Sequence, residues 1–289
     1  MNIAVLGQGF VGSYVFNYLS ANNDGAVHLL TQSANEYHKP GKLSSYIKDF
    51  NIEAVVNTCG FTGYPNVDNC ETNKAACTLY NVTIPLIIEE ECKKANAKLI
   101  HVSSGCIYTG YEKEYDETDI PNFGIHSEVS SFYSKTKHLS EMFLDTTFTN
   151  ILRIRMPITG NGDHKNLLIK LLKYDNLIDY RNSKTDIYTL CELVKVICYK
   201  FKPGIYNAVH HNALRTAEVV GIMISHNLTN PNWKFVPYED IPIVANRSNC
   251  VLSNEKIKRD FNFDFKSESH FIARNCSLIA KENKWQEKE

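Results

Sequence analysis

Short apolar runs alternate with amphipathic segments along the first third of the chain. Helical apolar spacing marks residues 11–21 and 71–95. The apolar runs have the length and the β-branched content of buried strands. They are NIAVLG, VHLLT, EAVVNTCG and KLIHVSS, at residues 2–7, 27–31, 53–60 and 98–104. Strands that alternate with helices predict an α/β fold with a doubly wound parallel sheet and right-handed crossovers.

The same pattern continues after residue 130 and then loosens. Further strands are predicted at residues 151–156 and 204–209, and helices at residues 130–148, 165–174, 190–199 and 254–261. The weaker alternation in the remainder indicates a second, smaller unit. We expect a larger domain over residues 1–156 and 182–212 and a smaller substrate-binding lobe over residues 157–181 and 213–289.

The turn after the first strand carries the clearest motif. GQGFVG follows a predicted strand and opens a predicted helix, which is the context that a dinucleotide-binding turn requires. Gly7 allows the tight turn, Gly9 lets the backbone approach a pyrophosphate, and Gly12 allows close helix packing. Phe10 and Val11 complete the turn at the helix N-terminus, which favours negative charge. We therefore predict a Rossmann-type dinucleotide-binding domain.

The end of the second strand indicates which cofactor binds. NAD-specific sites place Asp or Glu there to hold the adenosine ribose hydroxyls, whereas this chain has Thr31, Gln32 and Ser33. Without a carboxylate to repel it, a 2′-phosphate can be accepted by these hydroxyls and amides, with His38 or Lys39 nearby. NADP(H) is the predicted cofactor, and NADH stays open as an alternative.

A second motif lies on the helix predicted after residue 130. Tyr133 and Lys137 are four residues apart in FYSKTKH and share one helix face. An ammonium beside a phenol favours the phenolate, so we expect a lowered pKa for Tyr133 and proton exchange with a substrate oxygen near neutral pH. YxxxK by itself is common in helices, but because this one follows the dinucleotide turn and the strand that ends at Ser104, a catalytic role is favoured over a chance occurrence.

Composition narrows the class of protein. The 289 residues are 43% hydrophobic and 22% charged, with 31 Lys plus Arg against 32 Asp plus Glu. Binding of nucleic acid or of an anionic membrane through bulk charge is therefore not expected. MNIAVLG is not a signal-peptide pattern and no apolar stretch reaches the length of a membrane span, so we expect a cytoplasmic protein. Nine cysteines without a CxxC pair predict reduced thiols and no metal site.

Together these residues resemble the extended short-chain dehydrogenase/reductase family. In SSGCIY, Ser104 precedes Tyr108 by four positions, which is the spacing of the catalytic hydroxyl in that family. The resemblance implies that Ser104 hydrogen-bonds the carbonyl oxygen that is reduced. It also implies that Tyr133 protonates this oxygen and that Lys137 holds the nicotinamide ribose.

Longer motifs resemble the plant-type nucleotide-rhamnose synthases over essentially the whole chain. Those enzymes are bifunctional 3,5-epimerases and 4-keto-reductases. The chain departs from their pattern at Tyr64, where an Arg is expected, and at Asn69, where a Trp is expected. The motifs that carry the resemblance are NTCGFTGYPNVDNCE, SSGCIY, PNFGIHSEVSSFYSKTK, RIRMPI, NLLIKLLKY and ANRSN, at residues 57–71, 103–108, 121–137, 153–158, 166–174 and 245–249.

This resemblance implies a reaction and a catalytic base. UDP-4-keto-6-deoxy-D-glucose is epimerised at carbons 3 and 5, whose protons are alpha to the keto group, and is then reduced by NADPH to UDP-L-rhamnose. Cys106 is the predicted base, because a thiolate can remove such protons when Ser104 and Tyr133 stabilise the enolate oxygen.

The second lobe supplies the other predicted groups. Asn166, Lys170 and Lys173 share one face of a predicted helix. Lys170 matches the lysine of the rhamnose synthase pattern and is the predicted acid, with Lys173 as the reserve, while Asn166 is expected to contact substrate. Arg247 is the candidate for the pyrophosphate, because a guanidinium matches phosphate oxygens; a rim salt bridge is its alternative.

The resemblance also implies partners and leaves alternatives. A homodimer and an upstream UDP-glucose 4,6-dehydratase are expected. One alternative is a 4-keto-reductase without epimerase activity, like the dTDP-4-dehydrorhamnose reductases. Another is a non-catalytic NADP-binding regulatory subunit, against which the set Ser104, Cys106, Tyr133 and Lys137 argues. The nucleotide base, the order of the epimerisations and the oligomeric state are not fixed by the sequence.

Overall fold

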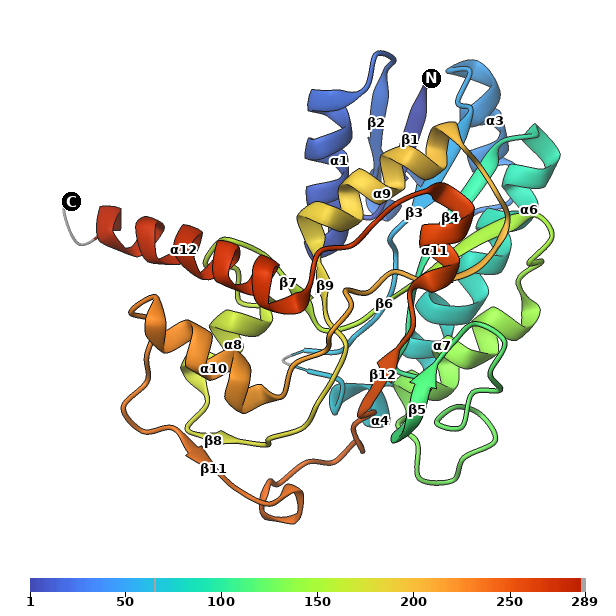
Figure 1. Cartoon of the computed structure of the whole chain (residues 1–289). Helices are drawn as coiled ribbons and strands as arrows, with labels where there is room; N and C mark the ends of the chain where they lie inside the picture. Colours follow the sequence, from blue (N-terminus) through green and yellow to red (C-terminus); the bar gives the residue numbers. More distant parts are fainter. Residues whose placement is uncertain (65, 287–289) are drawn as a thin grey trace.

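The centre of the molecule is a parallel sheet. The computed structural model describes residues 1–64 and 66–286. Within these residues, six parallel strands pair in the order β10 (Gly204–Asn207), β6 (Thr149–Ile154), β4 (Lys98–Ser104), β3 (Ala54–Asn57), β1 (Ile3–Leu6) and β2 (Val27–Leu30), as Figure 1 shows. The predicted doubly wound α/β fold with a parallel sheet is confirmed, and all six strands lie where the hydrophobic pattern predicts them.

The strand order reverses around β1. Ile3 of β1 lies opposite Val27 of β2 on one side and opposite Ala54 of β3 on the other. All residues of β1 and β3 are buried, because helices cover both faces of the sheet. Parallel α/β sheets bind ligands beyond the carboxyl ends of the strands where the order reverses, so this edge is the expected site.

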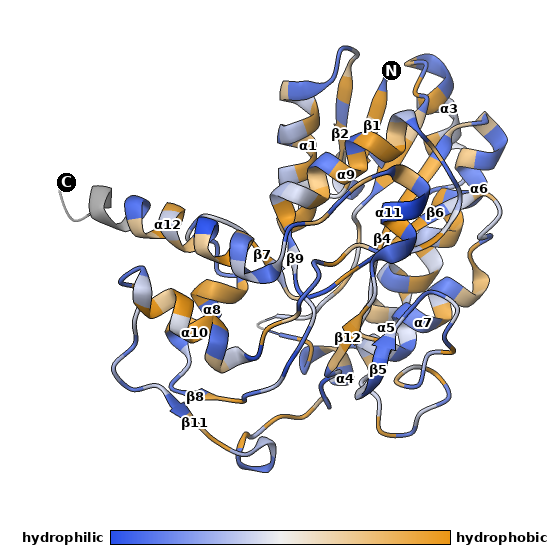
Figure 2. Cartoon of the chain, viewed as in Figure 1, coloured by the Kyte–Doolittle hydropathy of each residue, from blue (hydrophilic) through white to orange (hydrophobic). Residues whose placement is uncertain are grey.

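Helices cover the two faces of the sheet with separate cores. One core contains residues of α1 (Phe10–Asn22), α9 (Ile187–Tyr199) and α11 (Glu255–Phe261), and the other contains residues of α3 (Lys42–Asp49) and α6 (Ile84–Ala95). Figure 2 shows β1 and β2 as largely hydrophobic and α11 as largely hydrophilic. The expected lobe boundaries place α11 in the smaller lobe, whereas its Ile257 and Phe261 pack into the core of the sheet.

The segment that precedes α6 is less regular than the predicted single helical stretch. It consists of α4 (Asn69–Thr72), α5 (Lys74–Thr78) and a π-helical turn (Leu79–Thr83) that runs directly into α6. The π-helical turn contacts α7 (Phe132–Phe143), the helix that carries Tyr133 and Lys137. A π-helical turn inside a helix commonly marks a functional site.

The remaining elements form a smaller lobe with its own core. Its elements are β7 (Pro157–Ile158), α8 (Leu167–Lys173), β8 (Asn176–Leu177), β9 (Thr185–Asp186), α10 (Thr216–Ser225), β11 (Lys234–Phe235), a 3-10 turn (Tyr238–Asp240) and α12 (Glu268–Gln286). The core of this lobe joins α8, α10 and α12, which lie together on the left of Figure 1. Two further elements, β5 (Gly110–Tyr115) and β12 (Cys250–Leu252), pair with each other, and α2 (Gln32–Asn35) follows β2.

Two features of the sequence analysis can be compared directly with the fold. All nine cysteines are free, and only Cys106 among them is not buried, which agrees with reduced thiols that mostly serve as small core residues. None of the described helices has the length and the apolar character needed to cross a membrane.

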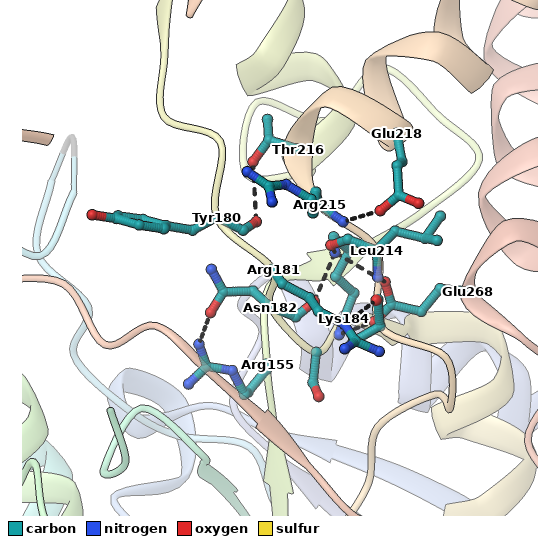
Figure 3. A network of polar contacts seen from close by, with 12 residues as sticks. Arg155, Tyr180, Arg181, Asn182, Lys184, Leu214, Arg215, Thr216, Glu218 and Glu268 are labelled. Atoms are coloured by element: carbon teal, nitrogen blue, oxygen red, sulfur yellow. Dashed lines mark hydrogen bonds and ion pairs between the residues drawn. The ribbon is translucent and has the colours of Figure 1, made fainter. Parts of the chain in front are cut away.

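A buried ion pair connects the start of α12 to the segment before β9. The Nζ atom of Lys184 lies 2.9 Å from an oxygen of Glu268 and donates to the carbonyl oxygens of Asn182 and Leu214, at 2.7 Å and 2.8 Å. Glu268 also accepts the backbone N–H groups of Lys184 and Leu214, at 2.7 Å and 2.9 Å. This carboxylate therefore links three segments of the chain (Figure 3).

Replacement of Glu268 tests how much this carboxylate contributes to the stability of the fold. We expect Glu268→Gln to lower the free energy of unfolding by about 3–5 kcal/mol, because the buried ammonium of Lys184 loses its counter-charge. Urea unfolding followed by circular dichroism measures the change. The control is Asp264→Asn in the exposed pair Lys258–Asp264, where a change below about 0.5 kcal/mol is expected. Equal effects of the two substitutions would contradict the assignment.

Candidate active site

The glycine turn between β1 and α1 is built for a ligand. A Cβ on Gly12 would lie 2.0 Å from the carbonyl oxygen of Gly7, and Gly7 itself has a φ of +99°, so packing of the helix on the strand requires both glycines. Gly9 has an ordinary φ of −79°, and a Cβ there would meet no atom within 4 Å. The protein therefore has no packing need for a glycine at this position. The open space beside the first turn of α1, where Phe10 and Val11 lie, fits the pyrophosphate of a dinucleotide.

The residues after β2 are available to the other end of a dinucleotide. The Thr31 hydroxyl caps α2 by accepting the N–H of Ala34 at 3.3 Å. Gln32 is half-buried and Ser33 is exposed. The next carboxylate along the chain, Glu36, is paired with Lys39 on the surface. Residues 31–33 thus offer hydroxyl and amide groups without a carboxylate, and their contact with a 2′-phosphate stays a prediction.

A tight turn at the end of β4 carries Ser104 and Cys106. Ser104 is the last residue of the strand and pairs with Ile154 of β6. The N–H of Gly105 donates to the carbonyl oxygen of Ile154 at 3.0 Å, and the N–H of Cys106 donates to the Ser104 hydroxyl at 3.2 Å. These bonds keep the hydroxyl and the half-buried thiol on one turn at the edge of the sheet where the strands end.

Tyr133 and Lys137 approach this turn from α7. The helix begins after Ser131, whose hydroxyl accepts the N–H of Ser134 at 3.1 Å. The Lys137 side chain is buried, and its Nζ lies 6.0 Å from the centre of the Tyr133 ring. The Cys106 thiol interacts electrostatically with both groups, and Ser104 lies beside the Tyr133 phenol. The structure thus brings the four predicted groups into one site.

The pKa of Tyr133 shifts in the direction opposite to the one predicted. Burial of the phenol raises the pKa of Tyr133, Cys106 adds to this effect, and the neighbouring Ser104 hydroxyl acts against it. Burial also lowers the pKa of Lys137, and Glu141 opposes that effect. The predicted lowering was wrong because removal of the phenolate from water outweighs the attraction of an ammonium at this distance. Tyr133 therefore stays protonated at neutral pH and is suited to donate a proton.

Asn81 is a part of the site that the sequence analysis did not find. This fully buried residue lies in the π-helical turn, and its amide accepts the N–H of Phe61 at 2.8 Å and donates to the carbonyl oxygen of Phe61 at 2.9 Å. A Cβ on Gly60 would lie 3.3 Å from the Nζ atom of Lys137. Asn81 therefore holds the segment after β3 against Lys137. A polar residue in the middle of an apolar helical stretch was the available signal.

The predicted residues of the smaller lobe separate into two kinds. Burial, together with the positive charges of Lys165 and Arg247, lowers the pKa of the half-buried Lys170, whereas Lys173 is exposed. The Arg247 guanidinium lies 2.8 Å from a carboxylate oxygen of Asp68, so it takes part in the salt bridge that was its alternative role. A contact of Arg247 with pyrophosphate stays a prediction.

Asn166 has a structural use in the fold. It is fully buried at the N-terminus of α8, where its side-chain oxygen accepts the N–H of Leu168 at 3.2 Å. Its amide nitrogen donates to the carbonyl oxygens of Thr159 and Asn161, each at 2.8 Å. These bonds engage the amide within the protein, and its predicted contact with substrate stays a prediction.

The arrangement of a glycine turn, a Ser–Tyr–Lys set and a second lobe recurs in known proteins. The RmlD substrate binding domain matches residues 1–274. The chain belongs to this family. It is 32% identical over 219 residues to a bifunctional dTDP-4-dehydrorhamnose 3,5-epimerase/dTDP-4-dehydrorhamnose reductase of Arabidopsis thaliana. The matched stretch covers 72% of this chain and 71% of that relative.

Longer plant proteins and solved structures of this family are also similar. A trifunctional UDP-glucose 4,6-dehydratase/UDP-4-keto-6-deoxy-D-glucose 3,5-epimerase/UDP-4-keto-L-rhamnose-reductase of Arabidopsis thaliana is 29% identical over 248 residues, which is 79% of this chain and 36% of that protein. The fold matches the L780 UDP-rhamnose synthase of Acanthamoeba polyphaga mimivirus with a TM-score of 0.86 and 22% identity, over 96% of this chain and 99% of the other. The resemblance seen in the motifs is confirmed, and the chain is an enzyme of the nucleotide-sugar oxidoreductase type.

Two alanine substitutions in the glycine turn separate folding from cofactor binding. We expect Gly12→Ala to lower the free energy of unfolding by about 3 kcal/mol or more, because its Cβ overlaps the Gly7 carbonyl oxygen. Gly9→Ala is expected to change stability by less than about 1 kcal/mol and to weaken NADPH binding by at least about tenfold. Urea unfolding and NADPH fluorescence titration measure the two effects. Unchanged NADPH binding in Gly9→Ala would argue against a pyrophosphate at this turn.

Proposed function

We propose that the protein converts UDP-4-keto-6-deoxy-D-glucose to UDP-L-rhamnose as a bifunctional 3,5-epimerase and 4-keto-reductase that uses NADPH. The observation that carries the proposal is the presence of the Cys106 thiol in the same site as Tyr133 and Lys137. A ketone reductase needs only the hydroxyl, the phenol and the lysine. A thiol beside them adds a base that can remove protons from the sugar ring.

NADP(H) is the cofactor, and when bound it supplies the hydride for carbon 4. Residues 7–12 hold its pyrophosphate, and residues 31–33 accept its 2′-phosphate. A dTDP-4-dehydrorhamnose reductase of Bacillus anthracis, whose structure was solved in complex with NADP, has this fold with a TM-score of 0.80 and 13% identity. Lys137 holds the nicotinamide ribose, Ser104 hydrogen-bonds the carbonyl oxygen, and the protonated phenol of Tyr133 delivers its proton to that oxygen.

Epimerisation precedes the reduction and uses a different pair of groups. The Cys106 thiolate removes the proton at carbon 3 or carbon 5, and the electrons of the C–H bond pass into an enolate whose oxygen is stabilised by Ser104 and Tyr133. The Lys170 ammonium returns a proton to the opposite face of the same carbon. The lowered pKa of Lys170 supports this role, because an acid is most effective when its pKa lies near the working pH.

A 4-keto-reductase without epimerase activity is the second candidate. Several solved structures with this fold are dTDP-4-dehydrorhamnose reductases, whose substrate is already epimerised. The homodimer, the cytoplasmic location and the supply of substrate by an upstream UDP-glucose 4,6-dehydratase remain parts of the proposal.

Solvent deuterium distinguishes the two candidates. The protein is incubated in deuterated water with NADPH and UDP-4-keto-6-deoxy-D-glucose, and the product is examined by NMR. We expect UDP-L-rhamnose with deuterium at carbons 3 and 5, because each proton is removed and replaced from solvent. The contrary outcome has two parts: UDP-4-keto-L-rhamnose is reduced, while UDP-4-keto-6-deoxy-D-glucose is neither turned over nor exchanged with solvent. That outcome would show a reductase without epimerase activity.

The Cys106→Ala variant tests the catalytic base. We expect this variant to lose deuterium exchange at both carbons and to keep a nearly unchanged affinity for NADPH.

The two lysines of α8 provide a matched pair for the acid. We expect Lys170→Met to slow formation of UDP-L-rhamnose from the unepimerised substrate by about 10²- to 10⁴-fold, as is typical for loss of a general acid. Lys173→Met is the control and is expected to leave the rate within about twofold. An effect confined to Lys173→Met would transfer the role to that residue.

The pH dependence of epimerisation follows from the pKa of Lys170. Burial disfavours the ammonium, so the pKa lies below the value of about 10.5 for an exposed lysine. The acid is present below this pKa and is lost as the pH rises through it. We therefore expect the rate of epimerisation to decline with rising pH, with the midpoint of this decline below pH 10.5. In a Lys170→Arg variant the midpoint is expected at a higher pH.

A further inference from the structure

Arg155 is a fully buried guanidinium behind the catalytic turn. It directly follows β6 and its side chain is 1% exposed. Its Nη1 atom donates to the carbonyl oxygen of Gly105 at 2.9 Å and to the Ser248 hydroxyl at 2.7 Å. Its Nη2 atom donates to the Asn182 side chain at 2.6 Å and to the Ser248 carbonyl oxygen at 3.1 Å. Figure 3 shows the bond to Asn182.

Within the part of the chain that the structure describes, no carboxylate forms an ion pair with Arg155. All four of its hydrogen bonds go to neutral oxygens, and its buried Nε atom has no partner among the described residues. Arg153, two residues earlier on β6, differs in this respect because its guanidinium lies 2.8 Å from Glu141. Burial of an unpaired charge costs free energy, so a fold that keeps one beside a functional turn gains something else from it.

The Arg155 side chain lies directly against the turn that carries Cys106. A Cβ on Gly105 would be 3.1 Å from the Cγ atom of Arg155 and 2.4 Å from a methyl group of Leu252, so only glycine fits between them. Because Gly105 separates Ser104 from Cys106, the bond from Arg155 to its carbonyl oxygen fixes the start of the segment on which the thiol stands.

Several charged or titratable groups face this part of the site. The guanidinium of Arg155 interacts electrostatically with the Cys106 and Cys250 thiols, with Tyr111 and with Glu268. On the side of α7, Cys106 faces Tyr133 and Lys137. Glu268 is already paired with Lys184, and Cys250 is fully buried. Among these groups, Cys106 is the one that stands on the turn whose Gly105 carbonyl oxygen Arg155 binds.

We propose that Arg155 is a positioning residue for Cys106: its guanidinium, bonded to the Gly105 carbonyl oxygen, holds the turn that presents the thiol to the sugar. The inference rests on the proposed epimerase function. It assigns Arg155 to epimerisation and not to reduction. Ser104 is held by its strand and Tyr133 by α7, so hydride transfer to an already epimerised ketone does not depend on the guanidinium.

The test compares three variants in two assays. Arg155→Met removes the charge, Arg155→Lys keeps a charge with fewer bonds, and Ser248→Ala removes one neutral acceptor and keeps the guanidinium. The first assay divides the rate of solvent deuterium exchange at carbons 3 and 5 by the rate of reduction of UDP-4-keto-L-rhamnose. The second measures alkylation of Cys106 by iodoacetamide at pH 7 with peptide mass spectrometry, which is selective because the other eight cysteines are buried.

We expect the ratio of exchange to reduction to fall by about tenfold in Arg155→Met, because the Gly105 carbonyl oxygen loses its donor and the turn no longer holds the thiol at the sugar. Alkylation of Cys106 is expected to become several times faster, because the half-buried thiol is held less firmly. Arg155→Lys is expected to recover to within about threefold of the wild type, and Ser248→Ala to stay within about twofold. The proposal would be overturned if both measured quantities stayed within twofold of the wild type in Arg155→Met. It would also be overturned if Arg155→Met and Arg155→Lys changed these quantities equally. Absence of exchange in the wild type refutes the epimerase function, and the alkylation rates then still decide the role of Arg155.

Arg155→Lys carries the test if Arg155→Met does not fold, because an ammonium can keep a bond to the Gly105 carbonyl oxygen and loses the other bonds of the guanidinium. We then expect a ratio of exchange to reduction about two- to threefold below that of the wild type. A ratio equal to or above that of the wild type would overturn the proposal.

Discussion

Burial of the central sheet on both faces is the constraint on which the rest of the structure depends. β1 is apolar along its whole length and β3 is apolar up to its last residue, Asn57, so polar and conformationally special residues gather where these strands end. Gly7 and Thr58 follow the two strands directly, and Ser104 closes β4. Because all the strands are parallel, these positions meet at one edge. The location of the active site is therefore a consequence of how the sheet is packed.

A buried ionic network then sets the position of α7 relative to that edge. Glu141 of α7 accepts the Ser103 hydroxyl of β4 at 2.8 Å and two N–H groups of Arg153 on β6, at 2.8 Å and 3.0 Å. One carboxylate on the helix thus fixes its distance from two strands. Tyr133 lies two helical turns before Glu141, and Lys137 lies one turn before it. The position of the phenol relative to the Ser104 hydroxyl therefore follows from a contact deep in the core.

The sequence predicted those parts of the structure that local pattern determines. Strand positions, the glycine turn and the pair Tyr133–Lys137 follow from periodicity and spacing within a few residues. The pKa direction of Tyr133 was missed because burial is a property of the assembled fold. The role of Arg155 was missed for the same reason, since its partners Gly105, Asn182 and Ser248 are far apart in the chain. Long-range contacts leave no local signal.

In the proposed function one phenol serves two reactions in sequence, and the raised pKa of Tyr133 suits both of them. During epimerisation the phenol must stabilise an enolate oxygen as a hydrogen-bond donor and keep its proton, since early transfer would leave no acid for the later step. During reduction it must release that proton to an alkoxide, which is a far stronger base than an enolate. Burial supplies this selectivity, because it disfavours the phenolate unless a strongly basic oxygen takes the proton. The direction that the sequence analysis missed is thus the one that both proposed steps require.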